Sequence, residues 1–188
     1  MKICLTVAVF AAATTVPAFA ADAYTIDPQH TFPGFDINHL GFSNMHGSFT
    51  ATTGKIVLDP GGNAGSIDAS IDLNSVTTGF AKRDDHLRSA DFFDVAKYPS
   101  MTFKSTRLKY NGTTLARADG ELTLHGVTKP VTLTVTNFNC GANPISKKPT
   151  CGGNATTTIK RSDFGISTYV PAISDDVKIT IEVEAIKD

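Results

Sequence analysis

The chain has 188 residues, 41% of them hydrophobic, and a formal net charge of −1. This length favours one domain with a substantial core, and the hydrophobic share excludes a disordered chain. The balanced charge gives no support for nucleic-acid binding, and a chain rich in Thr and Gly but poor in Leu favours strands over a helical bundle.

Residues 1–20 have the pattern of a secretory signal peptide. Lys2 supplies a positive charge, an apolar run follows from Ile3, and small residues stand at Ala18 and Ala20. This pattern predicts export to the periplasm, cleavage after Ala20 and a mature domain at residues 21–188. A membrane anchor is the alternative, which is less favoured because Thr and Pro interrupt the apolar run.

Most of the mature chain alternates between apolar and polar residues, which is typical of antiparallel strands with one buried face. Turn signals at residues 59–63 (DPGGN) and 111–112 (NG) separate neighbouring strands. The alternation predicts about eight strands, if 130–139 and its partner 154–161 are counted together. The predicted ranges are 24–28, 32–42, 46–58, 65–74, 101–110, 114–125, 130–139 with 154–161, and 176–187.

One segment breaks the alternation. Residues 82–88 (KRDDHLR) are good helix formers without a period of two, and Pro99 ends the segment. The sequence therefore predicts a short helical excursion at about residues 80–95 within an otherwise all-β chain.

Cys140 and Cys151 remain after removal of the signal peptide. In an oxidising compartment two cysteines predict a disulfide, which here would close a short loop. The alternative is a pair of reduced thiols that bind a metal, but neither a nearby His nor a third Cys supports it.

Eight antiparallel strands can form a sandwich or a closed barrel, and a barrel of this size is either filled by side chains or holds one ligand. Small residues such as Gly47, Ala69, Ala116 and Ala118 fall on the apolar faces, where they would leave space. Phenylalanines on the same faces could fill that space. The alternation leaves both possibilities open.

The polar residues give no clear catalytic signature. The histidines lack the spacing of a metal site, and the chain contains neither a serine-hydrolase elbow nor a phosphate-binding loop. We therefore predict no metal and no catalytic residues. An enzyme or redox accessory protein is kept as an alternative, with His30, His39 and His86 as its candidate titratable groups.

Charged residues of the helical excursion lie close in sequence to apolar ones. Arg83, Asp84 and His86 are predicted to form a polar rim that holds the headgroup of an amphiphile while its tail lies inside the barrel. The alternative is a helical lid that packs its apolar side on the barrel and exposes its charges to water.

Several motifs occur in the order of one known family. They are YTIDPQH at residues 24–30, HLGFS at 39–43, RDDHLRSADFFDV at 83–95, GELTLHGVTKP at 120–130 and RSDFGI at 161–166. With these motifs the mature chain resembles the YceI-like family of bacterial periplasmic lipid-binding proteins over nearly its whole length. It departs from the family at Pro33, which suggests a bulge or an edge position.

The resemblance implies a lipocalin-like antiparallel β-barrel that holds an isoprenoid lipid, of the isoprenoid quinone or polyprenyl phosphate type, in an apolar lumen. It further implies no required cofactor, no enzymatic activity, transient membrane contact and a possible homodimer. A stress-induced protein with a filled barrel is the remaining alternative. The residues expected to line the lumen are Phe35, Ile37, Phe42, Phe49, Ile71, Phe80, Leu87, Phe92, Met101, Phe103, Leu122, Leu133, Val135, Phe164 and Ile181.

Overall fold

The computed structural model describes residues 21–59, 61 and 64–188. The predicted signal peptide, residues 1–20, lies outside the described residues, so cleavage after Ala20 stays a prediction.

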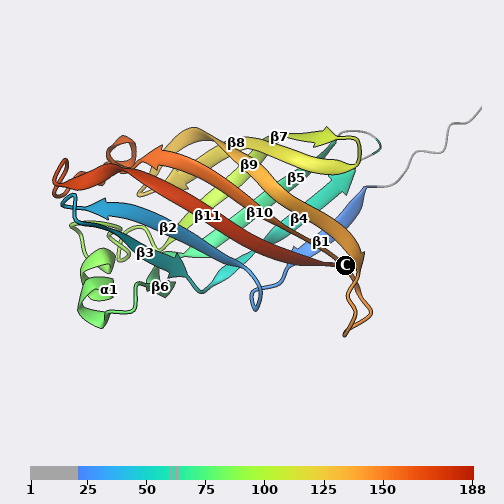
Figure 1. Ribbon diagram of the computed structural model, residues 1–188, viewed down its shortest axis with the longest axis horizontal. Coiled ribbons are helices and arrows are strands. Elements are labelled where there is room, and N and C mark those ends of the chain that lie inside the picture. The colour runs from blue at the N-terminus through green and yellow to red at the C-terminus, as the bar shows by residue number, and fades with distance from the viewer. Residues whose placement is uncertain (1–20, 60, 62–63) are drawn as a thin grey trace, which may run out of the picture.

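The described chain consists mostly of long strands wrapped around one axis, with a helix beside one end (Figure 1). The elements are β1 (Asp22–Ile26), β2 (Phe32–His39), β3 (Ser43–Phe49), β4 (Thr52–Asp59), β5 (Ala64–Asp72), the 3₁₀ helix η1 (Leu73–Ser75), β6 (Val76–Thr77), α1 (Ala81–Arg88), β7 (Ser100–Asn111), β8 (Thr114–Leu124), β9 (Val127–Ala142), β10 (Pro149–Lys160), the 3₁₀ helix η2 (Arg161–Phe164) and β11 (Ile173–Lys187).

Eight of these strands form a closed antiparallel barrel. Their order around the wall is β1, β4, β5, β7, β8, β9, β10 and β11, and β1 pairs with β11 to close the ring. In the closing pair, Tyr24 lies opposite Lys187 and Ile26 lies opposite Ala185. A closed ring leaves no unpaired strand edge over this part of the wall. The predicted antiparallel barrel is therefore confirmed, and the sandwich is excluded.

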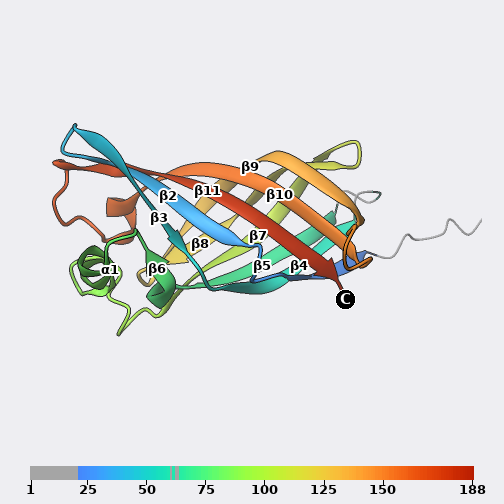
Figure 2. The ribbon, with the colours of Figure 1, turned by 60° about the horizontal axis from the view of Figure 1, so that its bottom comes forward.

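Near α1, the wall continues as three shorter strands. Residues 27–31 separate β1 from β2, residues 50–51 separate β3 from β4, and η1 separates β5 from β6. Beyond these breaks β2 pairs with β11 and β3, and β3 pairs with β6. Figure 2 shows β2, β3 and β6 on the side of the molecule where α1 lies, far from the C-terminus.

The breaks correct two predicted strands. The single strand predicted at residues 46–58 is two strands, because the backbone at Thr50 and Ala51 turns to η1 and β5. The amide of Thr50 donates to the carbonyl of Ser75 over 3.3 Å, and the amide of Asp72 donates to the carbonyl of Ala51 over 3.0 Å. The strand predicted at 32–42 ends at His39, because residues 40–42 form the turn to β3.

Register shifts change which residues face the barrel interior. Between β7 and β8 the pairing steps from Lys109 opposite Arg117 to Tyr110 opposite Leu115, so Ala116 is an extra residue on β8. A bulge of this kind bends its strand and reverses the alternation beyond it. Leu115 is buried in consequence, and the prediction that Ala116 shares the inner face with Ala118 is wrong.

The predicted helical excursion is confirmed, but its helix is shorter than the segment. Helix α1 ends at Arg88, where the hydroxyl of Ser89 donates to the carbonyl of His86 over 2.7 Å. Arg88 attaches the helix to the wall by donating to the carbonyls of Asn74 and Val76 over 2.9 and 3.0 Å. Among the described residues, no helix has the length and apolar character needed to cross a bilayer.

Two of the small residues on the inner face make room for aromatic rings. A Cβ atom added to Gly47 would lie 2.3 Å from the ring of Phe35, and one added to Gly120 would lie 2.5 Å from the ring of Phe103. At these positions the phenylalanines fill the space that the small residues leave. Other small residues, Ala69 and Ala118, face open space inside the barrel.

Cys140 and Cys151 form the predicted disulfide. They lie directly opposite each other on β9 and β10, where they tie together the hairpin that extends from the end of the barrel opposite α1. Cys151 is buried, whereas Cys140 is exposed.

We expect Cys140→Ser to lower the free energy of unfolding by about 3 kcal/mol, because the unfolded chain is no longer constrained by a short closed loop. For a domain of this size that corresponds to a loss of about 6–12 °C in Tm. Differential scanning calorimetry measures the loss, and the wild-type protein under reducing conditions should show a similar one. An unchanged Tm in both samples would contradict the prediction.

Candidate functional site: an apolar lumen with a polar mouth

The barrel encloses two adjoining cavities. The inner cavity, of about 150 Å³, lies within the closed ring of eight strands. The outer cavity, of about 490 Å³, lies between the barrel and the segments around α1. Four residues line both cavities, and we call them the waist: Pro33, Met101, Leu122 and Ile179.

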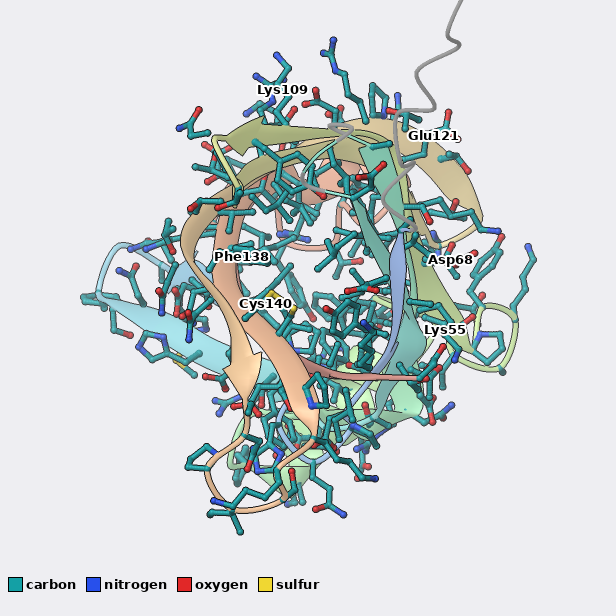
Figure 3. All side chains as sticks on the ribbon, turned by 90° about the vertical axis from the view of Figure 1, so that its right-hand side faces the viewer. Lys55, Asp68, Lys109, Glu121, Phe138 and Cys140 are labelled. Atoms are coloured by element: carbon teal, nitrogen blue, oxygen red, sulfur yellow. A yellow bond between two sulfur atoms is a disulfide. The ribbon has the colours of Figure 1, made fainter. Side chains whose placement is uncertain are left out.

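The side chains that line the inner cavity are apolar except for Thr31, Thr52, Asn154, Thr157 and the hydroxyl group of Tyr24. The alternation of strand β4 explains part of this lining, because Thr52, Ile56 and Leu58 point inward while Thr53 and Lys55 point outward. Figure 3 looks into the barrel from the end opposite α1. Phe138 lies toward the interior, and Lys55, Asp68, Lys109 and Glu121 lie on the outer surface. The interior is therefore a place for an apolar chain.

Polar groups gather around the outer cavity. Its lining includes the side chains of His39, His46, Arg83, His86 and Arg161, together with apolar residues of β2, β11 and the segment after α1. The lumen is thus apolar at depth and has polar groups at the end near α1, which we call the mouth. This arrangement suits a molecule with an apolar tail and a polar head.

Most of the residues predicted to line the lumen line one of the two cavities. Ile71, Phe103, Leu133, Val135 and Ile181 line the inner cavity, Phe35, Ile37, Phe49, Leu87 and Phe92 line the outer one, and Met101 and Leu122 belong to the waist. That these side chains bind a ligand stays a prediction.

Three of the predicted lumen residues lie elsewhere. Phe42 is 89% exposed, because β2 ends at His39 and the amide of Gly41 donates to Asn38 Oδ1 in the turn to β3. Phe80 is 55% exposed, because it precedes α1 on the outside of the barrel, where Arg83 lies over its ring. Phe164 is fully buried in η2 and packs in the core near α1 without lining a cavity.

The predicted polar rim is only partly at the mouth. Arg83 and His86 line the outer cavity, whereas Asp84 is buried beneath the helix. Asp84 accepts hydrogen bonds from the amide and hydroxyl of Thr78, with a distance of 2.8 Å to the amide nitrogen. Arg83 donates to the hydroxyl and carbonyl of the same threonine over 2.7 and 2.8 Å. Asp84 therefore anchors the start of α1, which corrects its assignment to the rim.

His86 is the rim residue with the best-defined surroundings. Its Nε2 lies 3.0 Å from Asp91 Oδ2, and its ring meets Phe92 edge-on with 5.0 Å between the ring centres. The ring of Tyr169 lies 6.3 Å away. This half-exposed imidazole can therefore present a polar group to a headgroup at the mouth.

The histidines proposed for an enzyme do not meet at one place. His39 and His86 line the outer cavity, but His30 lies in a polar surface groove and pairs with Asp27 over 2.8 Å. This hydrogen bond raises the pKa of His30 and lowers that of Asp27. His46 pairs with Asp36 across the β2–β3 hairpin, and no group of three His, Cys, Asp or Glu within residues 21–59, 61 and 64–188 is placed to hold a metal ion.

Arg161 is a mouth residue that the sequence analysis did not single out. The residue is 5% exposed, and its guanidinium donates to the carbonyls of Ile166, Thr168, Ile173 and Ser174 over 2.9–3.0 Å. Burial lowers its pKa. The side chain holds the segment from η2 to β11 in place. In the sequence, Arg161 is only the first residue of the RSDFGI motif, where no alternation indicates this role.

Comparisons with known proteins agree with this architecture. Residues 24–185 match the model of the YceI-like domain. Protein YceI of Salmonella arizonae is 42% identical over 177 residues, which are 93% of this chain and 91% of the relative.

Two solved structures illustrate the shared fold. Burkholderia cenocepacia BcnA is 25% identical, with a TM-score of 0.73 over 85% of this chain and 98% of its own. A polyisoprenoid binding domain from Saccharophagus degradans is 20% identical, with a TM-score of 0.67 over 89% of this chain and 99% of its own. Sequence, fold and extent of the match together establish that the chain belongs to the YceI-like domain family.

Proposed function

We propose that this protein binds an isoprenoid lipid, of the isoprenoid quinone or polyprenyl phosphate type, and carries it through the periplasm. The observation that carries the proposal is the lumen itself, in which an apolar inner cavity adjoins, at the waist, an outer cavity whose lining includes arginine and histidine. The tail would lie inside and the headgroup at the mouth. The likeness to a domain described as polyisoprenoid binding supports the same class of ligand.

The energetics of such a complex allow exchange with a membrane. Each buried CH₂ group contributes about 0.8 kcal/mol, so a chain of about twenty carbons contributes on the order of 10 kcal/mol before the cost of ordering. This free energy strongly favours the lumen over water, but it nearly cancels when the lipid comes from a bilayer, which also buries the chain. A carrier needs both a lumen that keeps the lipid out of water and the ability to exchange it with a membrane.

Native mass spectrometry of the purified mature protein tests the proposal. A bound mass that extraction identifies as an isoprenoid lipid would support a carrier. A protein without any bound mass, which also fails to take up a polyprenyl phosphate or a quinone from vesicles, would favour a filled barrel instead. Turnover of the bound lipid that disappears in a His39→Ala, His86→Ala double variant would favour an enzyme.

Loading from a membrane would use the mouth end of the molecule. Large apolar side chains are exposed there on the β2–β3 turn (Leu40 and Phe42), before α1 (Phe80) and on the segment after η2 (Tyr169). Figure 1 shows these segments together at the end where α1 lies. Exposed apolar side chains around the opening of an apolar cavity can insert into a lipid surface while the lipid passes.

We expect Phe42→Ser to slow lipid transfer from vesicles about tenfold, because a nearly fully exposed aromatic ring no longer enters the bilayer. Transfer of a fluorescent polyprenyl phosphate from phosphatidylethanolamine–phosphatidylglycerol vesicles measures the rate. Ile145→Ser is the matched control, because Ile145 is 90% exposed in the β9–β10 loop at the other end. Equal rates for both variants would contradict a membrane contact at the mouth.

A further inference from the structure

Two bulges lie next to each other in the barrel wall, toward the end opposite α1. Arg117 of β8 pairs with Thr134 of β9. Just beyond this pair, each strand carries one extra residue, because the pairing of β8 with β7 shifts at Ala116 and the pairing of β9 with β10 shifts at Thr136. A bulge re-aims the side chains that follow it, so the inner face of both strands changes at this level.

Both bulges turn a large apolar side chain into the inner cavity. Unbroken alternation would point the small Ala116 of β8 and the polar Asn137 of β9 inward. Instead, Leu115 and Phe138 line the inner cavity, and Figure 3 shows Phe138 directed toward the interior. We call Leu115 and Phe138 the floor.

The inner cavity ends at the floor. Leu115 is 5% exposed and belongs to a buried apolar cluster, against which Phe138 packs. Tyr110 lies opposite Leu115 on β7 and packs against the same cluster without lining the cavity. Its hydroxyl donates to the carbonyl of Ala64, the first residue of β5, over 3.1 Å. An apolar tail that enters from the waist therefore meets packed side chains at this level.

The space between the mouth and the floor limits the length of the tail. A cavity of about 150 Å³ lined by apolar side chains takes up benzene, a molecule about the size of one isoprene unit. The inner cavity has this volume, and the inner and outer cavities together have about four times as much. Together they would hold about four isoprene units.

We propose that the floor sets an upper limit of about four isoprene units on the tail of the bound lipid, and that Phe138 is the residue that decides this limit. The inference rests on the proposed function and adds a length requirement to it. Phe138→Ala removes a ring about the size of one isoprene unit, whereas Leu115→Ala removes a smaller group. Each change should therefore lengthen the accepted tail, the first by more than the second.

A competition between two prenyl phosphates tests the inference. Phosphatidylethanolamine–phosphatidylglycerol vesicles contain equal amounts of geranylgeranyl phosphate and of geranylfarnesyl phosphate, which is one isoprene unit longer. Native mass spectrometry measures the ratio of the two lipids bound to the delipidated wild type, Phe138→Ala, Leu115→Ala and Phe32→Ala. Phe32 is half-buried, as Phe138 is, but lines a groove on the outer surface, so Phe32→Ala is the matched control.

The expected result is a change in the ratio of bound lipids at the floor variants. Wild type and Phe32→Ala should bind the longer lipid about tenfold less, because the unit that finds no room in the lumen is left in water, whereas the bilayer buries it. Phe138→Ala should bind the two lipids about equally, and Leu115→Ala should give an intermediate ratio. Circular dichroism checks that each variant is folded.

Several outcomes would overturn the inference in distinguishable ways. If wild type binds both lipids equally, or if the folded Phe138→Ala and Leu115→Ala variants keep the wild-type ratio, the floor does not limit the tail, and lipid binding itself still stands. If Phe32→Ala changes the ratio as much as Phe138→Ala does, the effect does not arise at the floor. If neither lipid binds to any of the four proteins, the proposed function fails together with the inference.

Discussion

Leu122→Arg should be purified without the lipid that we expect the wild-type protein to retain. Leu122 is buried and belongs to the waist, so an arginine there would either occupy the lumen or face an apolar chain without a counter-charge. A charge in such a place costs several kcal/mol, and a loss of about 3 kcal/mol in binding already lowers affinity more than a hundredfold. Native mass spectrometry measures the retained lipid.

Two further variants separate a blocked lumen from a misfolded protein. Thr123→Arg places the same charge on the neighbouring residue, whose side chain lies on the other face and contacts Thr128, and should retain the lipid. Leu122→Trp obstructs the waist without adding charge and should fold, as judged by its circular dichroism, yet carry little lipid. Wild-type occupancy in both Leu122 variants would mean that the lipid does not pass the waist.

Arg161→Met should lower the free energy of unfolding by about 3 kcal/mol and disorganise the mouth. The guanidinium satisfies four backbone carbonyls, two in the segment that follows η2 and two at the start of β11. Methionine has a similar length but no donor, so buried carbonyls would lose their partners. For a domain of this size the corresponding loss of Tm is about 6–12 °C, which calorimetry measures.

A matched arginine supplies the control for this prediction. Arg107 is exposed on the outer wall and pairs with Asp119, so Arg107→Met should change the stability by less than about 1 kcal/mol. Arg161→Lys should be intermediate, because an ammonium group can reach fewer of the carbonyls. If Arg161→Met and Arg107→Met lowered Tm equally, the buried guanidinium would have no special structural role.

The effect of Arg161→Met on lipid binding should differ from its effect on stability. The inner cavity is lined by β1, β4, β5 and β7–β11 together with Thr31 and Pro33, away from the segment that Arg161 holds. A tail could still enter, but the headgroup would lose an ordered mouth. We therefore expect faster release of lipid to vesicles and only a modest loss of equilibrium affinity.

Parts of the lumen were predictable because its residues obey a local rule. Phe103, Leu133, Val135 and Ile181 alternate with polar neighbours within single strands, and each of them lines the inner cavity. The disulfide was predictable for a similar reason, since only two cysteines follow the predicted signal peptide.

The errors occurred where the chain departs from that rule. Phe42 and Phe80 are apolar residues in or beside turns, and their exposure depends on where β2 ends and α1 begins. The sequence predicts Asp84 at the polar rim because nothing nearby in sequence indicates that its carboxylate accepts hydrogen bonds from Thr78.

The alternation of the sequence is enough to predict the class of fold, since a period of two over most of the chain allows antiparallel strands with one buried face and little else. The helical excursion and the cysteine pair are also predictable from the sequence. That β1 closes on β11, and that bulges such as the one at Ala116 shift the inner face, is visible only in the folded molecule. The physical reason is that alternation is a property of neighbouring residues, whereas closure, bulges and cavities depend on residues far apart in the chain.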